Sequence, residues 1–475
     1  MRLIKEVATV LDEHGYRLES SICEVMKKFK LATQVNRAGL AKASGYSVTS
    51  VLTLVLMLPL MALDNINQFY KSHYSREGQI QKDAIYRLKN NEHYSWRSLL
   101  YRVAKAFRPL AGTCGPNKVT ALILDDTTDQ RVGYKMENIS HVFDHVIRKS
   151  VYGFKILALT FFDGMTNIPL DFTIHKEKEL PAKKRRRQFS KKADPRTAGG
   201  KRRKEAKSTK AEQAISLLKR AVKNGFTADY VLCDSWFTSE ALIAAVRSAA
   251  KGAMHLIAGV PNGNRKYCWG GGLFNASELI AIMRWQGDEH RCRRWNTRYF
   301  EAIVDYKGVG AVKLFMSRFP GQRKWRVFVA TDTSLSYVRM LEAYGVRWTI
   351  EVMFRECKQY LHLGKCQSQD FDAQIAGATT TFMLYTFLSY LKRKQDYATL
   401  GDVLSLLHED ACKKNLAERL FELFEDLLDL AVASISEHGT ADIGLIKQSQ
   451  EYRDIMGVFA SSFLFEQLAS VDITA

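Results

Sequence analysis

Proline, cysteine pairs and long apolar runs are all scarce in this sequence. Its 475 residues include 8 prolines, too few for a collagen-like or proline-rich repeat protein. The 8 cysteines are scattered without a CxxC pair, so we expect free thiols in a reducing cytoplasm. The most apolar stretch, Val51–Leu63, is shorter than the ~18 residues of a membrane span and contains Pro59, which favours a buried helix.

Acidic residues are also few in comparison with basic ones. The chain has 70 lysines and arginines but 50 aspartates and glutamates, which gives a formal net charge of +20. Such a surplus favours a polyanionic partner, first a nucleic acid and second an anionic membrane. Residues 1–17 include acidic side chains and no long apolar run, so we expect no secretory signal and a cytoplasmic protein.

The positive charge is concentrated between Lys183 and Lys210. This segment contains 14 lysines and arginines against two acidic residues, Asp194 and Glu205. Because it has few apolar residues, we predict a mobile surface loop that binds DNA phosphates, with a solvated linker as the alternative. It also lacks the apolar face that a membrane-binding helix needs. The side chains of this loop assigned to DNA are Lys184, Arg185, Arg186, Arg187, Arg202 and Arg203.

Hydrophobic periodicity divides the chain into helical and mixed regions. Within the N-terminal region, residues 37–52 have a spacing that fits either a helix-turn-helix or a packed helical hairpin. The expected divisions are a helical, DNA-binding N-terminal region at 1–112, an α/β domain at 113–260 and 325–395, a β-rich insertion at 261–324 and a helical C-terminal region at 396–475.

The α/β domain is expected to contain a mixed sheet flanked by helices. Short apolar runs rich in β-forming residues predict strands at 119–124, 152–162, 168–175, 230–233 and 255–260. Apolar residues at steps of three and four predict helices at 211–224, 238–250, 335–361 and 373–392.

Two aspartates follow predicted buried strands. Asp126 comes after the strand at 119–124, and Asp234 comes after the strand at 230–233. Neighbouring strands would hold such ends close together, and a divalent cation relieves the repulsion between two carboxylates. Carboxylate oxygens suit magnesium or manganese, and two such ions can cleave a phosphodiester bond. The alternative is that each aspartate only caps a turn or a helix.

A polar stripe follows one face of the long helix predicted near the end of the α/β domain. It comprises Tyr344, Arg347, Glu351, Arg355 and Lys358, which recur at steps of three or four residues. One carboxylate among cations suits a metal ligand surrounded by phosphate-binding groups. Intrahelical salt bridges on an exposed helix are the alternative.

Together these motifs resemble those of the IS-four family of bacterial transposases. The run from Tyr344 to Lys358 matches the family's YREK signature, and LDDTTD around Asp126 and VLCDSWF around Asp234 are similar to its two aspartate motifs. The resemblance covers residues 118–395, and the family also carries a β-rich insertion before its glutamate. It implies a DDE enzyme with a ribonuclease-H-like catalytic domain.

The resemblance also implies a role for each motif residue. Asp126, Asp234 and Glu351 would be catalytic and would bind two magnesium (or manganese) ions. Asp126 is preferred to its neighbour Asp125 because it directly precedes the Thr-Thr pair. The residues that would contact phosphates at the transposon end are Tyr344, Arg347 and Lys358.

Members of this family use an aromatic residue late in the insertion to capture a flipped base, an interaction that stacking favours. Trp325 closes the insertion and is the first choice. Trp285 and Trp295 lie within the insertion and are alternatives. Trp348, beside the signature arginine, would either line the same pocket or belong to the core.

The function implied by the resemblance is cut-and-paste DNA transposition. Hydrolysis at the transposon end would free a 3′-OH, which attacks the opposite strand to form a hairpin before release and joining to target DNA. The expected partners are the terminal inverted repeats, the target DNA and a second protomer, in association with the bacterial nucleoid. The alternatives are a ribonuclease-H-like nuclease of another type and a non-catalytic DNA-binding protein derived from a transposase.

Overall fold

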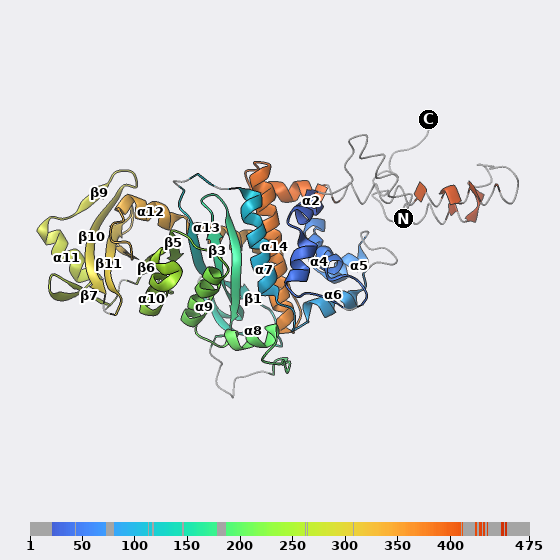
Figure 1. Cartoon of the computed structure of the whole chain (residues 1–475), viewed down its shortest axis with the longest axis horizontal. Coiled ribbons are helices and arrows are strands. Elements are labelled where there is room, and N and C mark those ends of the chain that lie inside the picture. The colour runs from blue at the N-terminus through green and yellow to red at the C-terminus, as the bar shows by residue number, and fades with distance from the viewer. Residues whose placement is uncertain are drawn as a thin grey trace. The chain divides into compact units, whose positions relative to one another are not determined.

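The structure, a computed structural model, describes residues 21–411 and a few residues between 423 and 453 (Figure 1). Within the first range it leaves out residues 43, 73–79, 113, 116–117, 145–146, 178–186, 262, 264, 307 and 410. The chain divides into a smaller unit, residues 1–24, 57–79 and 401–475, and a larger unit, residues 25–56 and 80–400. Across the described residues, no helix is long and apolar enough to cross a membrane.

The smaller unit contains short helices where it is described. They are η1 (Leu58–Met61) and α5 (Ile66–Lys71). Helix α5 begins after Asn65, whose side chain accepts a hydrogen bond from the backbone N–H of Gln68 at 3.0 Å. Residues 401–409 are helical, and most of the C-terminal region predicted at 396–475 lies outside the described residues.

The larger unit is built around a mixed sheet. Its strands are β1 (Ala121–Gln130), β2 (Ser140–Asp144), β3 (Lys149–Phe162), β4 (Asn167–His175), β5 (Tyr230–Cys233), β6 (His255–Val260), β7 (Lys266–Trp269), β8 (Gly272–Asn275), β9 (His290–Cys292), β10 (Thr297–Tyr306), β11 (Gly310–Arg318) and β12 (Arg326–Ala330). Over the described residues the strand order is β2-β3-β1-β5-β6-β12-β11-β10-β7-β8, with β4 also paired to β3 and β9 to β10.

Parallel pairing is confined to the middle of this sheet. Strands β1, β5 and β6 run parallel to one another, whereas β3 and β12 flank them in antiparallel orientation. The inner part of β1, Ala121–Leu124, is fully buried, as expected for a strand covered by helices on both faces. The predicted mixed α/β fold is therefore confirmed, and the flanking helices make it consistent with a ribonuclease-H-like fold.

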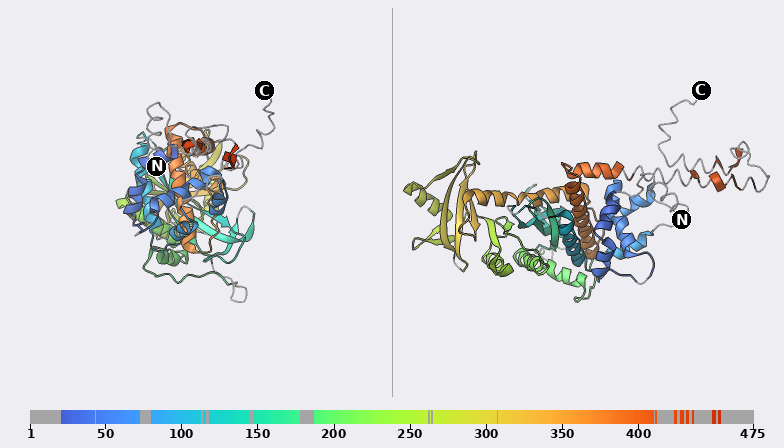
Figure 2. Two further views of the ribbon diagram at one scale, coloured as in Figure 1. Left: turned by 90° about the vertical axis from the view of Figure 1, so that its right-hand side faces the viewer. Right: turned by 45° about the horizontal axis from the view of Figure 1, so that its top comes forward.

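Helices cover both faces of the sheet (Figures 1 and 2). The helices of the larger unit, with those that extend into it, are α2 (Ser21–Lys28), α3 (Leu31–Arg37), α4 (Val48–Met57), α6 (Lys82–Lys89), α7 (Trp96–Ala111), α8 (Ala198–Ala206), α9 (Lys210–Lys223), α10 (Glu240–Ser248), η3 (Ala249–Gly252), α11 (Ala276–Gln286), α12 (Tyr337–Gly345), α13 (Trp348–Tyr360) and α14 (Phe371–Lys394). Between α3 and α4 lie residues 38–47, a longer connection than the about three to four residues of a helix-turn-helix turn.

The main core lies between strand β4 and its helices. All nine residues of β4 are buried, because α7, α8, α9 and α14 pack against this strand. Helix α14 is buried along most of its 24 residues and also packs against α7. Near its C-terminal end, Phe387 meets the ring of Phe29 edge-on, with 4.9 Å between the ring centroids. Aromatic pairs of this geometry add to the stability that burial supplies.

Residues 261–324 extend the same sheet. Strand β11 pairs with β12, and β10 pairs with β11 along most of its length. The segment also contains helix α11, and strands β10 and β11 continue the sheet beyond β12 (Figure 2).

The sequence prediction of one helix at 335–361 is wrong. The structure has two helices, α12 and α13, separated at Val346 and Arg347. At the junction the backbone N–H of Val346 donates to the carbonyl of Ala343, and that of Arg347 donates to the carbonyl of Tyr344. These are three-residue hydrogen bonds, which tighten the chain, and Gly345 is a poor helix former just before them.

The prediction of a continuous loop at 183–210 is also wrong. Helix α8 occupies 198–206 of this segment and begins at Thr197, whose side chain accepts from the backbone N–H of Gly200 at 3.0 Å. Helix α9 follows at once, capped by Thr209, which exchanges hydrogen bonds with Glu212. A paired cap of this kind fixes where a helix starts. The position of Lys210 in the first turn is therefore defined by the sequence around it.

Candidate active site

Asp125 and Asp234 lie where the parallel pairing between strands β1 and β5 ends. The last parallel pair joins Leu124 of β1 to Cys233 of β5. Asp125 is the next residue of β1, and Asp234 is the first residue after β5. The prediction that Asp126 follows the end of a strand is wrong, since β1 continues beyond it by pairing with β3 alone. The aspartates instead meet at the carboxyl end of β5.

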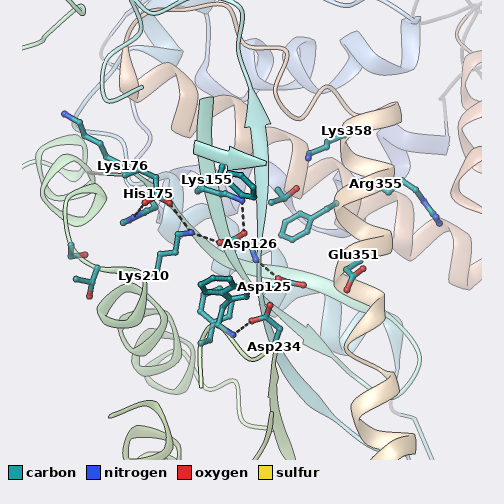
Figure 3. Close-up of a pocket in the computed structure, with 18 of the residues that line it drawn as sticks. Asp125, Asp126, Lys155, His175, Lys176, Lys210, Asp234, Glu351, Arg355 and Lys358 are labelled. Carbon is teal, nitrogen blue, oxygen red and sulfur yellow. Dashed lines mark hydrogen bonds and ion pairs between the residues drawn. The ribbon is translucent and has the colours of Figure 1, made fainter. Parts of the chain in front are cut away.

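A pocket of about 1860 Å³ opens at this end of the strand (Figure 3). Asp125 and Asp126 of β1, Asp234 after β5 and Glu351 of α13 all line it. Helix α13 packs against β1, which brings its glutamate to the two strands. The three carboxylates predicted to bind metal thus share one pocket, although they are far apart in the sequence.

One arginine connects two sides of this pocket. Arg347 Nη1 donates to Asp125 Oδ2 at 2.9 Å, and its Nη2 donates to Glu351 Oε1 at 2.6 Å. Burial raises the pKa of Asp125 to about 7 despite the attraction of Arg347, and the negative charge of Asp234 adds to the rise. Burial raises the pKa of Asp234 as well, with a further contribution from Asp126. The pocket therefore holds more negative charge than this arginine balances.

Asp126 has different partners from its neighbour. Lys155 Nζ of β3 lies 3.5 Å from Asp126 Oδ1, and Lys210 Nζ of α9 lies 3.1 Å from Asp126 Oδ2. Neither lysine was predicted from the sequence as a member of this carboxylate site. Lys155 carried a signal, because it is a single charged residue inside the apolar run of β3, and a charge buried in a sheet needs an opposite charge nearby.

Lys358 points from α13 to β1. Its Nζ donates to the backbone carbonyl of Thr128 at 2.6 Å, and burial lowers its pKa. Arg355 also lines the pocket but is exposed. Both residues line the pocket, but in Figure 3 the side chain of Lys358 points towards β1 whereas that of Arg355 points away from the aspartates.

Tyr344 lies apart from the other signature residues. It belongs to α12, and the turn before α13 separates it from Glu351. Its hydroxyl donates to the backbone carbonyl of Cys233 at 3.4 Å, and its ring packs against Phe328. Burial raises its pKa to about 12. Tyr344 therefore supports the backbone just before Asp234 in this structure, and its proposed phosphate contact stays a prediction.

The four tryptophans proposed for base capture have different environments. Trp348, the first residue of α13, is 60% exposed, so the expectation that it belongs to the core is wrong. It is not among the residues that line the carboxylate pocket, and its part in base capture stays a prediction. Trp285 is 87% exposed and Trp295 is 42% exposed. Trp325 is packed: its ring centroid lies 5.1 Å from that of Phe300, and the guanidinium groups of Arg284 and Arg318 lie 5.8 and 5.3 Å from it.

A fifth tryptophan, Trp236, was not among the site residues predicted from the sequence. Trp236 is two residues after Asp234, lines the pocket and is 78% exposed. Its backbone N–H donates to Asp234 Oδ1 at 2.9 Å, which orients that carboxylate. The signal in the sequence was its position beside a predicted catalytic aspartate.

The packing of the tryptophans leads to a prediction about stability. Trp325→Ala is expected to destabilise the larger unit by about 3 kcal/mol, because a large ring leaves a packed cluster. Trp285→Ala should leave the unfolding midpoint unchanged, because its side chain is mostly in solvent. Chemical unfolding of the two variants followed by circular dichroism checks this. Equal unfolding midpoints for the two variants would mean that the packing around Trp325 does not contribute to the stability of the fold.

The cations of the basic segment are not equivalent. Lys184, Arg185 and Arg186 lie outside the described residues, and Arg187 is exposed.

Arg202 and Arg203 are 6% and 9% exposed. Arg202 Nη1 donates to the carbonyl of Phe172, and Arg203 binds Glu137 and Asp372, each at 2.8 Å. The expectation that these two arginines face DNA is therefore wrong in this structure. Acidic partners compensate the burial of both charges, since Arg202 also lies within 4 Å of Asp171 and Glu205.

The pocket residues fit a hard divalent cation. Asp125, Asp126, Asp234 and Glu351 offer carboxylate oxygens, which such cations prefer. Burial is the main cause of the raised pKa of Asp125 and Asp234, and repulsion from neighbouring carboxylates, which a cation would relieve, adds to it. Within the part of the chain that the structure describes, no three such side chains are already arranged as a metal site. Lys155 and Lys210 pair with Asp126, and Arg347 pairs with Asp125 and Glu351.

A mixed sheet that brings acidic residues from two central strands and a following helix into one pocket is typical of metal-dependent enzymes acting on phosphodiesters. Family comparisons agree with this class. Residues 74–269 match the model of the DDE superfamily endonuclease, and residues 200–387 match the model of the transposase DDE domain. A search of curated proteins found no match. The two matches support a transposase or endonuclease of the DDE superfamily.

Proposed function

We propose that this chain is a cut-and-paste DNA transposase similar to those of the IS-four family. The observation that carries the proposal is the pocket where Asp126, Asp234 and Glu351 meet, inside the residues matched by the two DDE models. Its partners would be the terminal inverted repeats of its element and the target DNA. Two protomers would act together, because two transposon ends must be held at once.

Asp126, Asp234 and Glu351 would hold two magnesium or manganese ions. When bound, such ions activate a water or a 3′-OH and stabilise the leaving oxygen of the phosphodiester. The cations on α13 would position the DNA backbone beside the carboxylates, since phosphate contacts fix the register of a protein on DNA. Arg347 is suited to grip a phosphate with two donors, whereas Lys358 offers a point charge.

The reaction proposed for this site is hydrolysis at the transposon end followed by transesterification through a hairpin. A cleavage assay on DNA that ends in the element's own inverted repeat tests the proposal, with nicked, hairpin and released products separated on a denaturing gel. Nicks without hairpins or joined products would favour the alternative, a DDE endonuclease that cuts without strand transfer. DNA binding without any cleavage would favour a non-catalytic derivative.

Arg347 gives this proposal a specific test. Arg347→Ala is expected to slow cleavage or hairpin formation at the transposon end by roughly a hundredfold, or about 2.7 kcal/mol, because a bidentate phosphate contact and a link to Glu351 are lost together. Arg347→Lys should restore only part of the rate, because a lysine lacks the forked geometry.

The product ladder and its rate measure these effects, and affinity for unrelated DNA provides the control. That affinity should change by less than the cleavage rate. Wild-type ladders and rates from both variants would make Arg347 a structural residue of the Asp125–Glu351 bridge.

A further inference from the structure

Lys210 lines the carboxylate pocket but has no role in the catalytic mechanism proposed above. It is the first residue of α9, and its side chain is 32% exposed. Its Nζ lies 3.1 Å from Asp126 Oδ2 and 3.2 Å from Glu177 Oε1 (Figure 3). Lys210 therefore bridges the candidate metal ligand of β1 and a carboxylate just beyond the end of β4.

The other oxygen of the same carboxylate is also occupied. Lys155 Nζ lies 3.5 Å from Asp126 Oδ1, and its side chain is 5% exposed. Each oxygen of the Asp126 carboxylate thus faces the ammonium group of one lysine. A divalent cation cannot bind closely to Asp126 while both ammonium groups stay, because like charges a few ångströms apart repel strongly in a partly buried site.

The two lysines differ in their freedom to move. Lys155 is enclosed within the sheet, so its head group cannot leave without a rearrangement of β3 and its neighbours. Lys210 sits at the edge of the pocket on a flexible four-carbon stem, and its second partner, Glu177, can hold it away from Asp126. Glu177 stays ionised, because contacts with His175 and Lys210 hold its pKa at about 2 despite partial burial.

Further positive charge lies on the same side of the pocket. Lys176 and Lys207 also line it, and Figure 3 shows Lys176 on the same side as Lys210 and Lys155, across the pocket from Glu351 on α13. An anion near Lys210 would therefore meet several cations. A DNA phosphate is the anion that fits, since the pocket has carboxylates on its other side and the chain carries a net charge of +20.

We propose that Lys210 neutralises Asp126 in the DNA-free protein and turns to a DNA phosphate when a divalent cation binds Asp126. This inference rests on the proposed function, because it takes Asp126 as a metal ligand and DNA as the substrate. Lys210 is then a positioning residue that couples the two binding events. The two binding events are thermodynamically linked: if a bound metal ion raises the affinity for DNA by some factor, bound DNA raises the affinity for the metal ion by the same factor. In the DNA-free protein, Lys210 therefore lowers the affinity of the site for the metal ion.

The metal arm of the test uses the full-length, DNA-free protein. Mn²⁺ binding is measured by isothermal titration calorimetry for the wild type, Lys210→Met and Lys207→Met. Lys207→Met is a matched control, as it removes the same charge from the same pocket wall three residues away. Lys210→Met is expected to bind Mn²⁺ about tenfold more tightly than the wild type, because a competing charge has left the carboxylate. Lys207→Met should change the affinity by no more than about twofold.

The DNA arm measures affinity for a duplex that ends in the inverted repeat bordering the gene, with and without Ca²⁺. Lys210→Met should lose several-fold more affinity with Ca²⁺ than without it, because only the metal-bound state releases Lys210 to a phosphate. Lys207→Met should lose the same factor in both conditions. Lys210→Gln provides a second variant whose side chain stays polar, and the same signs are expected for it.

These outcomes separate the inference from the proposed function. Unchanged or weaker Mn²⁺ binding by both Lys210 variants, with wild-type binding abolished by Asp126→Ala, would overturn the inference and leave the metal site intact. An equal loss of DNA affinity with and without Ca²⁺ would also overturn it. If neither the wild type nor any variant bound Mn²⁺, the metal site of the proposed function would fail together with the inference.

Discussion

Asp126→Ala, Asp234→Ala and Glu351→Ala are each expected to abolish DNA strand cleavage while leaving most DNA affinity in place. Each side chain lines the same pocket and would provide oxygen ligands to a cation that stabilises the transition state. The expected loss is at least roughly a thousandfold in rate, or about 4 kcal/mol of transition-state stabilisation. Most affinity should remain because phosphate contacts elsewhere supply it. A magnesium-dependent cleavage assay and a separate binding assay measure the two effects.

Asp125 makes this experiment more informative. The register of β1 and β5 puts Asp125, not Asp126, level with Asp234, and Arg347 ties Asp125 to Glu351. The sequence motif favours Asp126. We expect Asp125→Asn to slow cleavage by about tenfold, as the loss of a partner for Arg347 misplaces Glu351 without removing a ligand. If Asp125→Ala abolished cleavage and Asp126→Ala cut DNA nearly normally, the ligand would be Asp125.

The sequence was sufficient for the fold class and for the elements with strong local patterns. Strand β4 was predicted to within one residue, and β3 with its correct end but a start three residues too late, because both contain apolar runs rich in β-forming residues. Helix α14 was predicted to within two residues at each end, because its apolar residues recur at steps of three and four. Patterns of this kind depend on neighbouring residues alone, so no knowledge of tertiary contacts is needed to recognise them.

Tertiary contacts decided the features that the sequence did not predict. Arg202 and Arg203 belong to a strongly basic run, and charge density alone predicts a solvated loop. Their acidic partners, such as Glu137 and Asp372, are distant in the sequence and come close only in the folded protein. The break between α12 and α13 is also invisible to periodicity, because only two residues, Val346 and Arg347, separate the two helices.

The candidate site was predictable only in part for a similar reason. Motif spacing identified Asp126, Asp234 and Glu351, which the structure brings to one pocket. Lys155 and Lys210 belong to no motif, and their role depends on the register of β3 against β1 and on where α9 starts. Such positions follow from pairing and capping in three dimensions, which one sequence does not display.

The second large effect is expected at Asp171, in the buried ion network under α8. Asp171 has no exposed side-chain surface and accepts hydrogen bonds from Arg97 at 2.8 Å and Arg220 at 2.6 Å, with Arg202 at 3.9 Å. Burial by itself would raise its pKa, but the three guanidinium groups outweigh burial and hold the pKa at about 2. One carboxylate therefore balances much of the positive charge in this part of the core.

Asp171→Asn is expected to lower the free energy of unfolding by about 3–5 kcal/mol, because it removes one of the two carboxylates, Asp171 and Glu205, that pair with these arginines, while keeping the side-chain volume. Chemical unfolding of the full chain measures this loss. Asp194→Asn is the control: Asp194 pairs with Arg196 at 2.9 Å in the same basic segment, but this pair is exposed, so the unfolding midpoint should not move. Equal midpoints for wild type and Asp171→Asn would show that the arginines find other partners.

The pH dependence of unfolding provides an independent check on Asp171. Its pKa of about 2 in the folded chain lies below the usual aspartate value of about 3.9, so its ionised form stabilises the fold. This contribution is complete above about pH 4 and is lost as the pH falls from about 4 towards 2. Asp171→Asn should therefore lose less stability over that interval than the wild type. If both proteins lost the same stability between pH 4 and 2, Asp171 would not be the carboxylate that supports the network.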